Sequence, residues 1–269
     1  MIVPPIEQFA KEAKAIGHIN WMPDVDGTIR QQPLVVQFDG KTYPSFALQT
    51  ARLALNLDLG EIVLKPDMVQ IGQRQIPSSA NYSMLVNFNG GTKTFPHFSF
   101  VDVVTKKIGA ENFKDKIVIL GVTATGLGEQ RATPVSETLP TVEYIANVVE
   151  NILHGKFIVR PAWAPKVELG TMIVFALFVM LGIPLLSASV SAIIAAACLL
   201  IFGAGSFWMF GSKGNWIQVF YPSIMLVMGY VVVVSKRYLV TEKAKEVLET
   251  ESVETTKMLG LSFQGQGML

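Results

Sequence analysis

A long uncharged stretch, residues 169–210, limits what this chain can fold into. One helix of roughly 40 residues would extend ~63 Å, about twice the ~30 Å hydrocarbon core of a bilayer. The stretch must therefore turn, and Gly182-Ile183-Pro184 predicts the place because proline removes an interior helix hydrogen bond. Gly211–Asn215 predicts a second turn. We expect three transmembrane helices, at about residues 168–185, 188–210 and 216–235.

Charge is nearly absent from this membrane block. Between Gly170 and Ser235 the one charged residue is Lys213, which argues against ion or proton transport. Cys198 is the single cysteine of the chain, so no disulfide can form within one chain. We expect it to act as a small apolar filler.

The whole chain is 50% hydrophobic and 16% charged, which is too apolar for a soluble protein and too charged for a purely membrane one. Its 269 residues fit one soluble domain, residues 1–160, followed by a membrane block. The net charge of +1 gives no reason to expect a nucleic-acid partner.

Three crossings place the soluble domain and the C-terminal tail on opposite sides of the membrane. Positive charge after the third helix favours a cytoplasmic tail; these residues are Lys236, Arg237, Lys243 and Lys245. Positive charge also stands before the first helix, at Lys156, Arg160 and Lys166. Charges beside a large domain have less influence on membrane orientation. The domain would then be exported, yet Met1–His18 has no apolar region of signal-peptide length. Either the chain lacks its natural N-terminus or the topology is inverted.

The soluble part alternates between strand and helix patterns, which is typical of an α/β domain with a mixed sheet and flanking helices. Asp39-Gly40 between apolar segments predicts a hairpin of residues 34–38 and 41–43. Ser45 predicts the cap of a helix over residues 45–57. Two more strands are predicted, at Met84–Phe88 and at Lys116–Gly121, and the strand at Lys116–Gly121 is expected to be buried. Two more helices are predicted, from Ser99 to Ile108 and from Val142 to His154. The helix at Val142–His154 is expected to end at Gly155.

Two loops resemble binding motifs only in part. The loop Gly121–Gly128 follows a predicted strand, but Leu127 and Gly128 stand where a phosphate-binding loop needs Lys and Ser or Thr. The segment Asp24-Val25-Asp26-Gly27 suggests a calcium loop, but Ile29 and Val35 occupy the positions that need Gly and Glu. Turns are the favoured interpretation of both loops.

Catalytic and metal-binding patterns do not stand out either. His18, His97 and His154 lie far apart, without acidic residues at metal-ligand spacing on a helix. Glu129 and Glu137 flank Thr133-Pro134 and leave a glycosidase-like pair open as an alternative. The sequence assigns no catalytic, cofactor-binding or metal-binding residue.

Several segments together resemble the CHASE type 2 domain, an extracellular sensor of bacterial receptors. The matching pieces, in order, are Gly17–Asn20, Asp24–Arg30 with Pro33-Leu34, Tyr43–Leu48, Asn87–Gly90, Phe98–Val103, Lys116–Gly121, Ala124, Thr133-Pro134, Val142–Asn147 and Ile152-Leu153. Three transmembrane helices after such a domain add to the resemblance. Thr141 departs from it, since the family usually has Gly there.

The resemblance implies a multi-pass protein of the inner (cell) membrane, with the sensor domain outside and the tail inside. It implies an unidentified extracytoplasmic ligand, a cytoplasmic kinase or nucleotide cyclase domain in the same natural chain, and a homodimer as one arrangement. Family members begin with a membrane anchor and a first α/β half, so the chain is expected to be a fragment truncated at both ends. The family supplies no established catalytic residues or cofactor.

The expected division is a partial sensor domain at 1–160, a stiff linker at 161–167, the membrane block at 168–235, and a helical cytoplasmic linker at 236–269 that leads to an absent effector. The expected function is non-catalytic signal transduction. Two alternatives stay open: a membrane-anchored periplasmic hydrolase and a membrane scaffold subunit.

Overall fold

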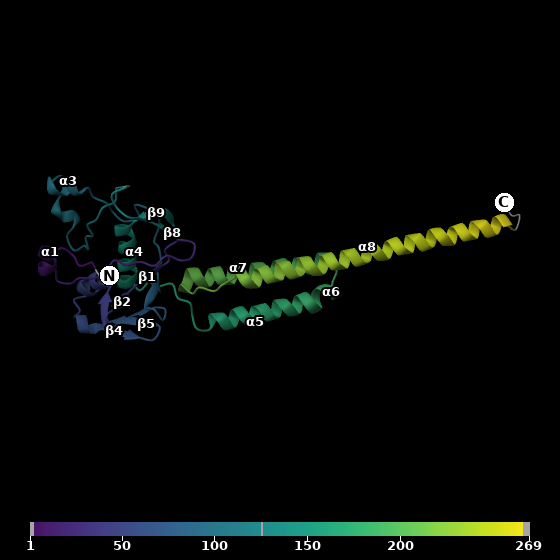
Figure 1. Ribbon diagram of the computed structural model, residues 1–269, viewed down its shortest axis with the longest axis horizontal. Helices are drawn as coiled ribbons and strands as arrows, with labels where there is room; N and C mark the ends of the chain where they lie inside the picture. Colours follow the sequence, from purple (N-terminus) through teal and green to yellow (C-terminus); the bar gives the residue numbers. More distant parts are fainter. Residues whose placement is uncertain (1–2, 125, 266–269) are drawn as a thin grey trace. The chain divides into compact units, whose positions relative to one another are not determined.

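The protein divides into two compact units, residues 1–159 and 160–269. The computed structural model describes residues 3–124 and 126–265, with no account of the side chains of 242–251 and 259–265. Residues 266–269, the end of the predicted tail, therefore lie outside the described residues. Figure 1 shows the helices and strands of both units.

Small antiparallel sheets and helices make up the first unit, which confirms the predicted α/β class. Among the described residues, β1 (Gln31–Pro33) pairs with β7 (Ser83–Leu85), and β2 (Val35–Phe38) with β3 (Lys41–Pro44). β4 (Ile62–Lys65), β5 (Met68–Ile71) and β6 (Arg74–Pro77) form one sheet, and β8 (Gln130–Thr133) and β9 (Ser136–Pro140) another. The helices are α1 (Glu7–Glu12), α2 (Phe46–Ala54), η1 (Leu59–Glu61), α3 (Phe100–Val104), η2 (Ala110–Asn112) and α4 (Thr141–His154).

Local sequence signals set several of these elements. Asp39 and Gly40 both have positive φ, 49° and 70°, as a type I′ turn between β2 and β3 requires. Ser45 caps α2, because its Oγ accepts the backbone N–H of Leu48 at 3.1 Å. Gly155 ends α4 with φ 66°, a left-handed conformation that suits glycine. The hairpin and the two helix ends are therefore confirmed.

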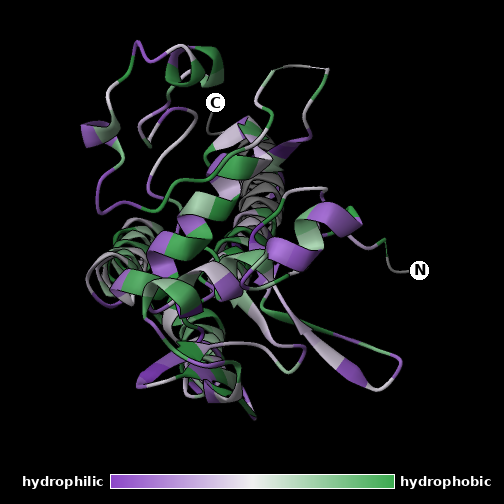
Figure 2. Cartoon of the chain, turned by 90° about the vertical axis from the view of Figure 1, so that its left-hand side faces the viewer, coloured by the Kyte–Doolittle hydropathy of each residue, from purple (hydrophilic) through white to green (hydrophobic). Residues whose placement is uncertain are grey.

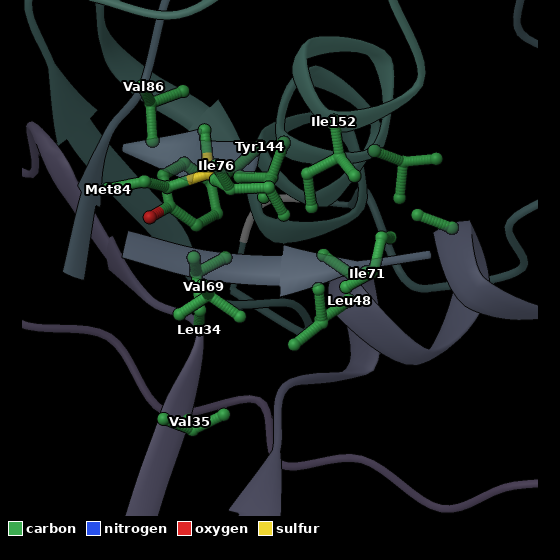
Figure 3. Packing of buried hydrophobic residues seen from close by; sticks show 14 of the residues in the cluster. Leu34, Val35, Leu48, Val69, Ile71, Ile76, Met84, Val86, Tyr144 and Ile152 are labelled. Atoms are coloured by element: carbon green, nitrogen blue, oxygen red, sulfur yellow. The ribbon is translucent and has the colours of Figure 1, made fainter. Parts of the chain in front are cut away.

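The hydrophobic core of the first unit lies between α4, α2 and the sheets (Figure 3). Ile152 on α4, Leu48 on α2 and Ile71 on β5 are fully buried. Burying such a side chain contributes ~1.5–3 kcal/mol relative to leaving it exposed. Packing of α4 on α2 thus stabilises the elements that carry the polar groups described below.

Residues 116–121 do not form the predicted buried strand. They belong to no strand in the part of the chain that the structure describes, and Val118 and Leu120 are 60% and 75% exposed. An apolar run fits a strand only where a neighbouring strand pairs with it and side chains cover it. The apolar side chains of Phe100 and Val101 in α3 are exposed as well. Figure 2 shows the chain coloured by the hydropathy of each residue.

Three more predicted elements are shorter than expected. The helix predicted over residues 45–57 ends at Ala54. The helix predicted from Ser99 to Ile108 is limited to α3, and Ser99 makes no side-chain cap bond among the described residues. In α3, Asp102 Oδ1 lies 3.3 Å from Lys107 Nζ. The strand predicted at Met84–Phe88 ends at Leu85, because side chains of α4 bond the backbone that follows.

The second unit contains three helices long and apolar enough to span a membrane, Ala164–Leu185, Ala188–Lys213 and Phe220–Thr241. The first comprises α5 (Ala164–Leu177), the π-helical η3 (Phe178–Gly182) and α6 (Ile183–Leu185), and the second is α7. Three spans were predicted, and three are found in the described residues.

The helix ends differ from the predicted ones. α5 begins within the segment predicted as a stiff linker, because Pro165 stands in its first turn, where a missing N–H costs nothing. Pro184 likewise stands at the start of α6, so the chain turns only at Leu186 and Ser187. Ser187 caps α7, and left-handed Gly214 ends it, three residues later than the predicted boundary at 210.

The helix that contains the third candidate span is longer than the span itself. α8 extends from Phe220 to Gly265, 46 residues without an interruption. It begins four residues after the predicted start at 216 and includes most of the predicted tail. The third candidate span and residues 242–265 are thus one continuous helix.

Candidate functional site

A row of buried polar side chains on α4 holds the chain segment after β7. Glu143, Asn147 and Asn151 are four residues apart, so they lie on one face of the helix. Asn151 Oδ1 accepts the N–H of Asn87 at 2.7 Å, and its Nδ2 donates to the Asn87 carbonyl at 2.9 Å. Asn147 Oδ1 accepts the N–H of Asn89 at 2.9 Å. The row replaces the hydrogen bonds that a neighbouring strand would supply.

Glu143 extends this row to a loop. Its Oε1 accepts the backbone N–H of Thr94 at 2.8 Å, while its Oε2 lies 3.7 Å from His97 Nε2. The Glu143 side chain is 1% exposed and that of His97 35%. The carboxylate thereby anchors the loop around Thr94 on α4.

A second polar cluster surrounds a small cavity of about 10 Å³. Its polar lining comes from the segment before β1, from β1, from β8 and from the start of α4: His18, Gln32, Arg131, Thr141 and Tyr144. Its apolar lining comes mainly from α2 and α4. A space of this size holds about one water-sized particle.

Arg131 is the most deeply buried cation at this cavity, with a side chain 2% exposed. Its Nε donates to Thr141 Oγ1 at 3.1 Å and its Nη2 to Glu129 Oε2 at 2.8 Å. The Trp21 ring lies 4.2 Å from the guanidinium carbon, a cation–π contact. Nη1 is buried without a hydrogen-bond partner among the described residues. Burial lowers the pKa of Arg131, since an apolar environment disfavours the charged form.

His18 lies at the same cavity in its neutral form. Burial lowers the pKa of its imidazole from 6.5 to about 4. Nδ1 accepts the N–H of Asn20 at 3.2 Å, so the ring proton resides on Nε2. That Nε2–H is buried and has no acceptor in the described part of the chain.

Tyr144 closes the cavity from α4. Its hydroxyl donates to the Gln31 carbonyl at 3.0 Å. Burial raises the pKa of this phenol, which therefore stays protonated.

The carboxylates of the hydrolase alternative do not form a buried pair. Glu129 precedes β8, has a side chain 71% exposed and pairs with Arg131. Glu137 lies on β9 and is exposed. Neither lines the cavity, so the structure offers this alternative no support.

The partial binding motifs are turns. Arg30 Nη1 and Nη2 bond Asp24 and Asp26, each at 2.7 Å, so the two carboxylates already have a cationic partner. These hydrogen bonds hold the pKa of Asp26 far below its usual range. In the loop Gly121–Gly128, Gly126 has φ 85° and residue 125 lies outside the described residues.

The three histidines do not come together. His18 lies at the cavity, His97 beside Glu143, and His154 beside Glu150 on α4, with Nδ1 at 3.1 Å from Oε2. Within the described residues no three metal-binding side chains cluster.

Sequence reasoning missed Arg131 and the polar row of α4. The row was visible as Glu143, Asn147 and Asn151 at four-residue spacing in an otherwise apolar helix. Arg131 gave no signal of its own, because an arginine in a short strand is usually exposed.

Polar contacts also occur at both ends of the membrane unit. Glu168 in the first span accepts a bond from Arg160 Nη2 at 2.9 Å and from the Gln218 N–H at 2.8 Å, so its charge is compensated. At the other end, Arg237 Nη1 donates to the Leu186 carbonyl at 2.6 Å. α8 is thus hydrogen-bonded to the turn between the first two spans.

Apolar contacts join the spans between these ends. Phe175, Ala195 and Leu226, one from each span, form a buried cluster. Cys198 packs against it, which confirms its expected role as an apolar filler.

Comparison with protein families matches residues 2–184 to the CHASE2 domain. No curated protein and no solved structure is significantly similar to the chain. The match includes the segments that carry the resemblance, the polar row of α4 and the cavity residues, and it extends into the first membrane span. The chain belongs to the CHASE2 family of sensor domains and is a membrane protein with three candidate spans.

Proposed function

We propose that this chain is a non-catalytic sensor module that passes an extracytoplasmic signal to a cytoplasmic effector, a kinase or nucleotide cyclase. Residues 1–159 would form the sensor outside the inner membrane, and the described part of α8 after Thr241 would leave the membrane into the cytoplasm. The ligand would bind the first unit, and the effector would receive α8.

The observation that carries this proposal is the continuity of α8. Its span ends at Thr241, and the helix continues to Gly265, ~36 Å further at ~1.5 Å per residue. A helix transmits displacement along its length because its backbone hydrogen bonds fix each turn to the next. Movement of the third span would therefore reach the tail directly.

The contacts of α8 supply a route into that helix. Arg237 bonds the Leu186 carbonyl, and Tyr230 Oη donates to the Ala188 carbonyl at 3.1 Å. Gly229 allows close approach to Val179 of η3, since a Cβ there would lie 2.9 Å from Val179 Cγ1. The first span directly follows the sensor unit in the chain. A shift of this span would thus displace α8.

Topology can be tested with single cysteines in a Cys198→Ala background. Lys114 in the first unit and Glu254 in α8 are both exposed. In intact spheroplasts, a membrane-impermeant maleimide should label Lys114→Cys directly and Glu254→Cys only after permeabilisation. The Cys198→Ala chain without added cysteine is the control. The reverse pattern, or equal labelling of both sites, would exclude the proposal.

Relay can be tested by joining α8 to a reporter cyclase. Inserting one residue after Glu254 turns the following helix by ~100°, whereas inserting seven returns it to within ~20° of its original phase. Reporter output should change with the first insertion and stay near wild type with the second. Equal output from both insertions would contradict relay through a rigid helix.

A further inference from the structure

Two buried hydrogen-bond donors without an acceptor line the same cavity. They are Nη1 of Arg131 and Nε2 of His18, and neither has a partner in the described parts of the chain. Buried polar groups in folded proteins are nearly always satisfied, so each such exception calls for an explanation. Both groups can only donate, because arginine has no acceptor and His18 Nδ1 already accepts from Asn20.

Two neighbouring acceptors are bonded to other donors. Thr141 Oγ1 accepts from Arg131 Nε and donates to the Glu129 carbonyl at 2.9 Å. The Gln31 carbonyl accepts from the Tyr144 hydroxyl. In the described residues neither acceptor is bonded to Arg131 Nη1 or His18 Nε2, which leaves room for an occupant that accepts from both donors.

The charge around the cavity is unbalanced. Arg131 is buried, while its counter-ion Glu129 has a side chain 71% exposed and is screened by water. A buried charge whose only described carboxylate partner is exposed is compensated in part, so negative charge inside the cavity is favoured. The volume of about 10 Å³ restricts the occupant to one small particle, such as a water molecule or a single halide ion.

We propose that the cavity between His18 and Arg131 binds one small monovalent anion of the size of chloride. Arg131 Nη1 supplies a charge-assisted hydrogen bond and His18 Nε2–H a second one. This assignment deepens the proposed function by naming the ligand class of the sensor, and it rests on that function only for the biological role of the anion. A water molecule would accept the same two bonds but would add no negative charge beside Arg131 Nη1.

The test uses the full chain in phospholipid nanodiscs, first equilibrated in sodium gluconate. Sodium chloride then replaces gluconate at constant ionic strength, and the thermal unfolding midpoint of the first unit is followed together with the chloride NMR line width. We expect a saturable rise of the midpoint, roughly 5 °C at saturation, and saturable line broadening. Bromide should act like chloride, and sulfate should have no effect because it exceeds the cavity.

Variants locate the site. His18→Phe should weaken chloride binding roughly 10-fold or more, since one bond to a charged group is lost. Arg131→Gln should abolish the response. His154→Phe and Arg30→Gln are matched controls at exposed positions and should respond like wild type.

Equal midpoints in chloride and gluconate for the wild-type chain would overturn the assignment and leave water as the occupant. A chloride affinity of His18→Phe equal to that of the wild-type chain would overturn it as well. Both results concern chloride binding alone. Failure of the proposed relay would instead appear in the labelling and insertion experiments, so the two failures can be told apart.

Discussion

Replacing Asn151 by leucine tests how the polar row of α4 holds the segment after β7. The two side chains have similar size, but leucine can neither accept from the Asn87 N–H nor donate to its carbonyl. Asn151 is fully buried, so water does not replace the lost partner easily.

The cost follows from these contacts. Each backbone group left without a partner costs ~1–3 kcal/mol, or about 2–6 kcal/mol for the two. Burial of the leucine side chain offsets ~1.5–3 kcal/mol of this. From the middle of each range, we expect the free energy of unfolding to fall by about 2 kcal/mol.

Hydrogen exchange of the Asn87 amide, in the full chain in nanodiscs, measures this change at the site. A loss of ~1.4 kcal/mol corresponds to tenfold faster exchange, so the rate should rise by roughly 30-fold. Asn81→Leu is the control, because Asn81 is exposed and its replacement should change stability by less than ~0.5 kcal/mol. Unchanged protection of Asn87 in Asn151→Leu would refute the idea that α4 side chains replace a strand partner.

Other predictions concern the membrane unit and the cavity. Gly229→Ala should lower the thermal midpoint of the membrane unit, because its Cβ would lie 2.9 Å from Val179 Cγ1. Adding Val179→Ala should restore the midpoint in a double-mutant cycle. Additive losses of the two substitutions would contradict the contact. Arg237→Gln should destabilise the same unit by ~1 kcal/mol or more, because the bond to the Leu186 carbonyl is lost. Unfolding at increasing detergent concentration measures this loss of stability. Lys236→Gln is the control. The pKa of His18 is lowered to about 4 in the folded chain. Between pH 6.5 and 4 the unfolded chain therefore binds a proton more readily than the folded one. The stability of the first unit is thus retained above pH 6.5 and lost as the pH falls through this range. In His18→Gln this loss should be smaller, and identical pH profiles of unfolding would contradict the burial of His18.

Elements that depend on neighbouring residues were predictable from the sequence. Asp39-Gly40 sets its turn because few residues tolerate two positive φ angles in succession. Gly155 and Ser45 likewise mark helix ends through their own chemistry. The three spans followed from length and hydropathy, which depend on the bilayer rather than on tertiary contacts.

Elements that depend on distant partners were not predictable. Residues 116–121 have a strand-like composition, but strand formation requires a partner that single-sequence patterns cannot identify. The cavity joins His18 to Arg131, 113 positions later in the chain, through tertiary packing alone. The helix ends at Pro165 and Pro184 were misplaced because proline both breaks a helix interior and suits a first turn.

The uncovered apolar segment at 116–121 has a practical consequence for work with this protein. Short, β-prone stretches with little charge and no proline can recruit identical stretches of other molecules into intermolecular sheets. Val118 and Leu120 present their side chains to solvent, so concentrated preparations are expected to aggregate through this stretch. A lysine at position 118 would act as a gatekeeper, and it should raise solubility without disturbing the buried core around Ile152.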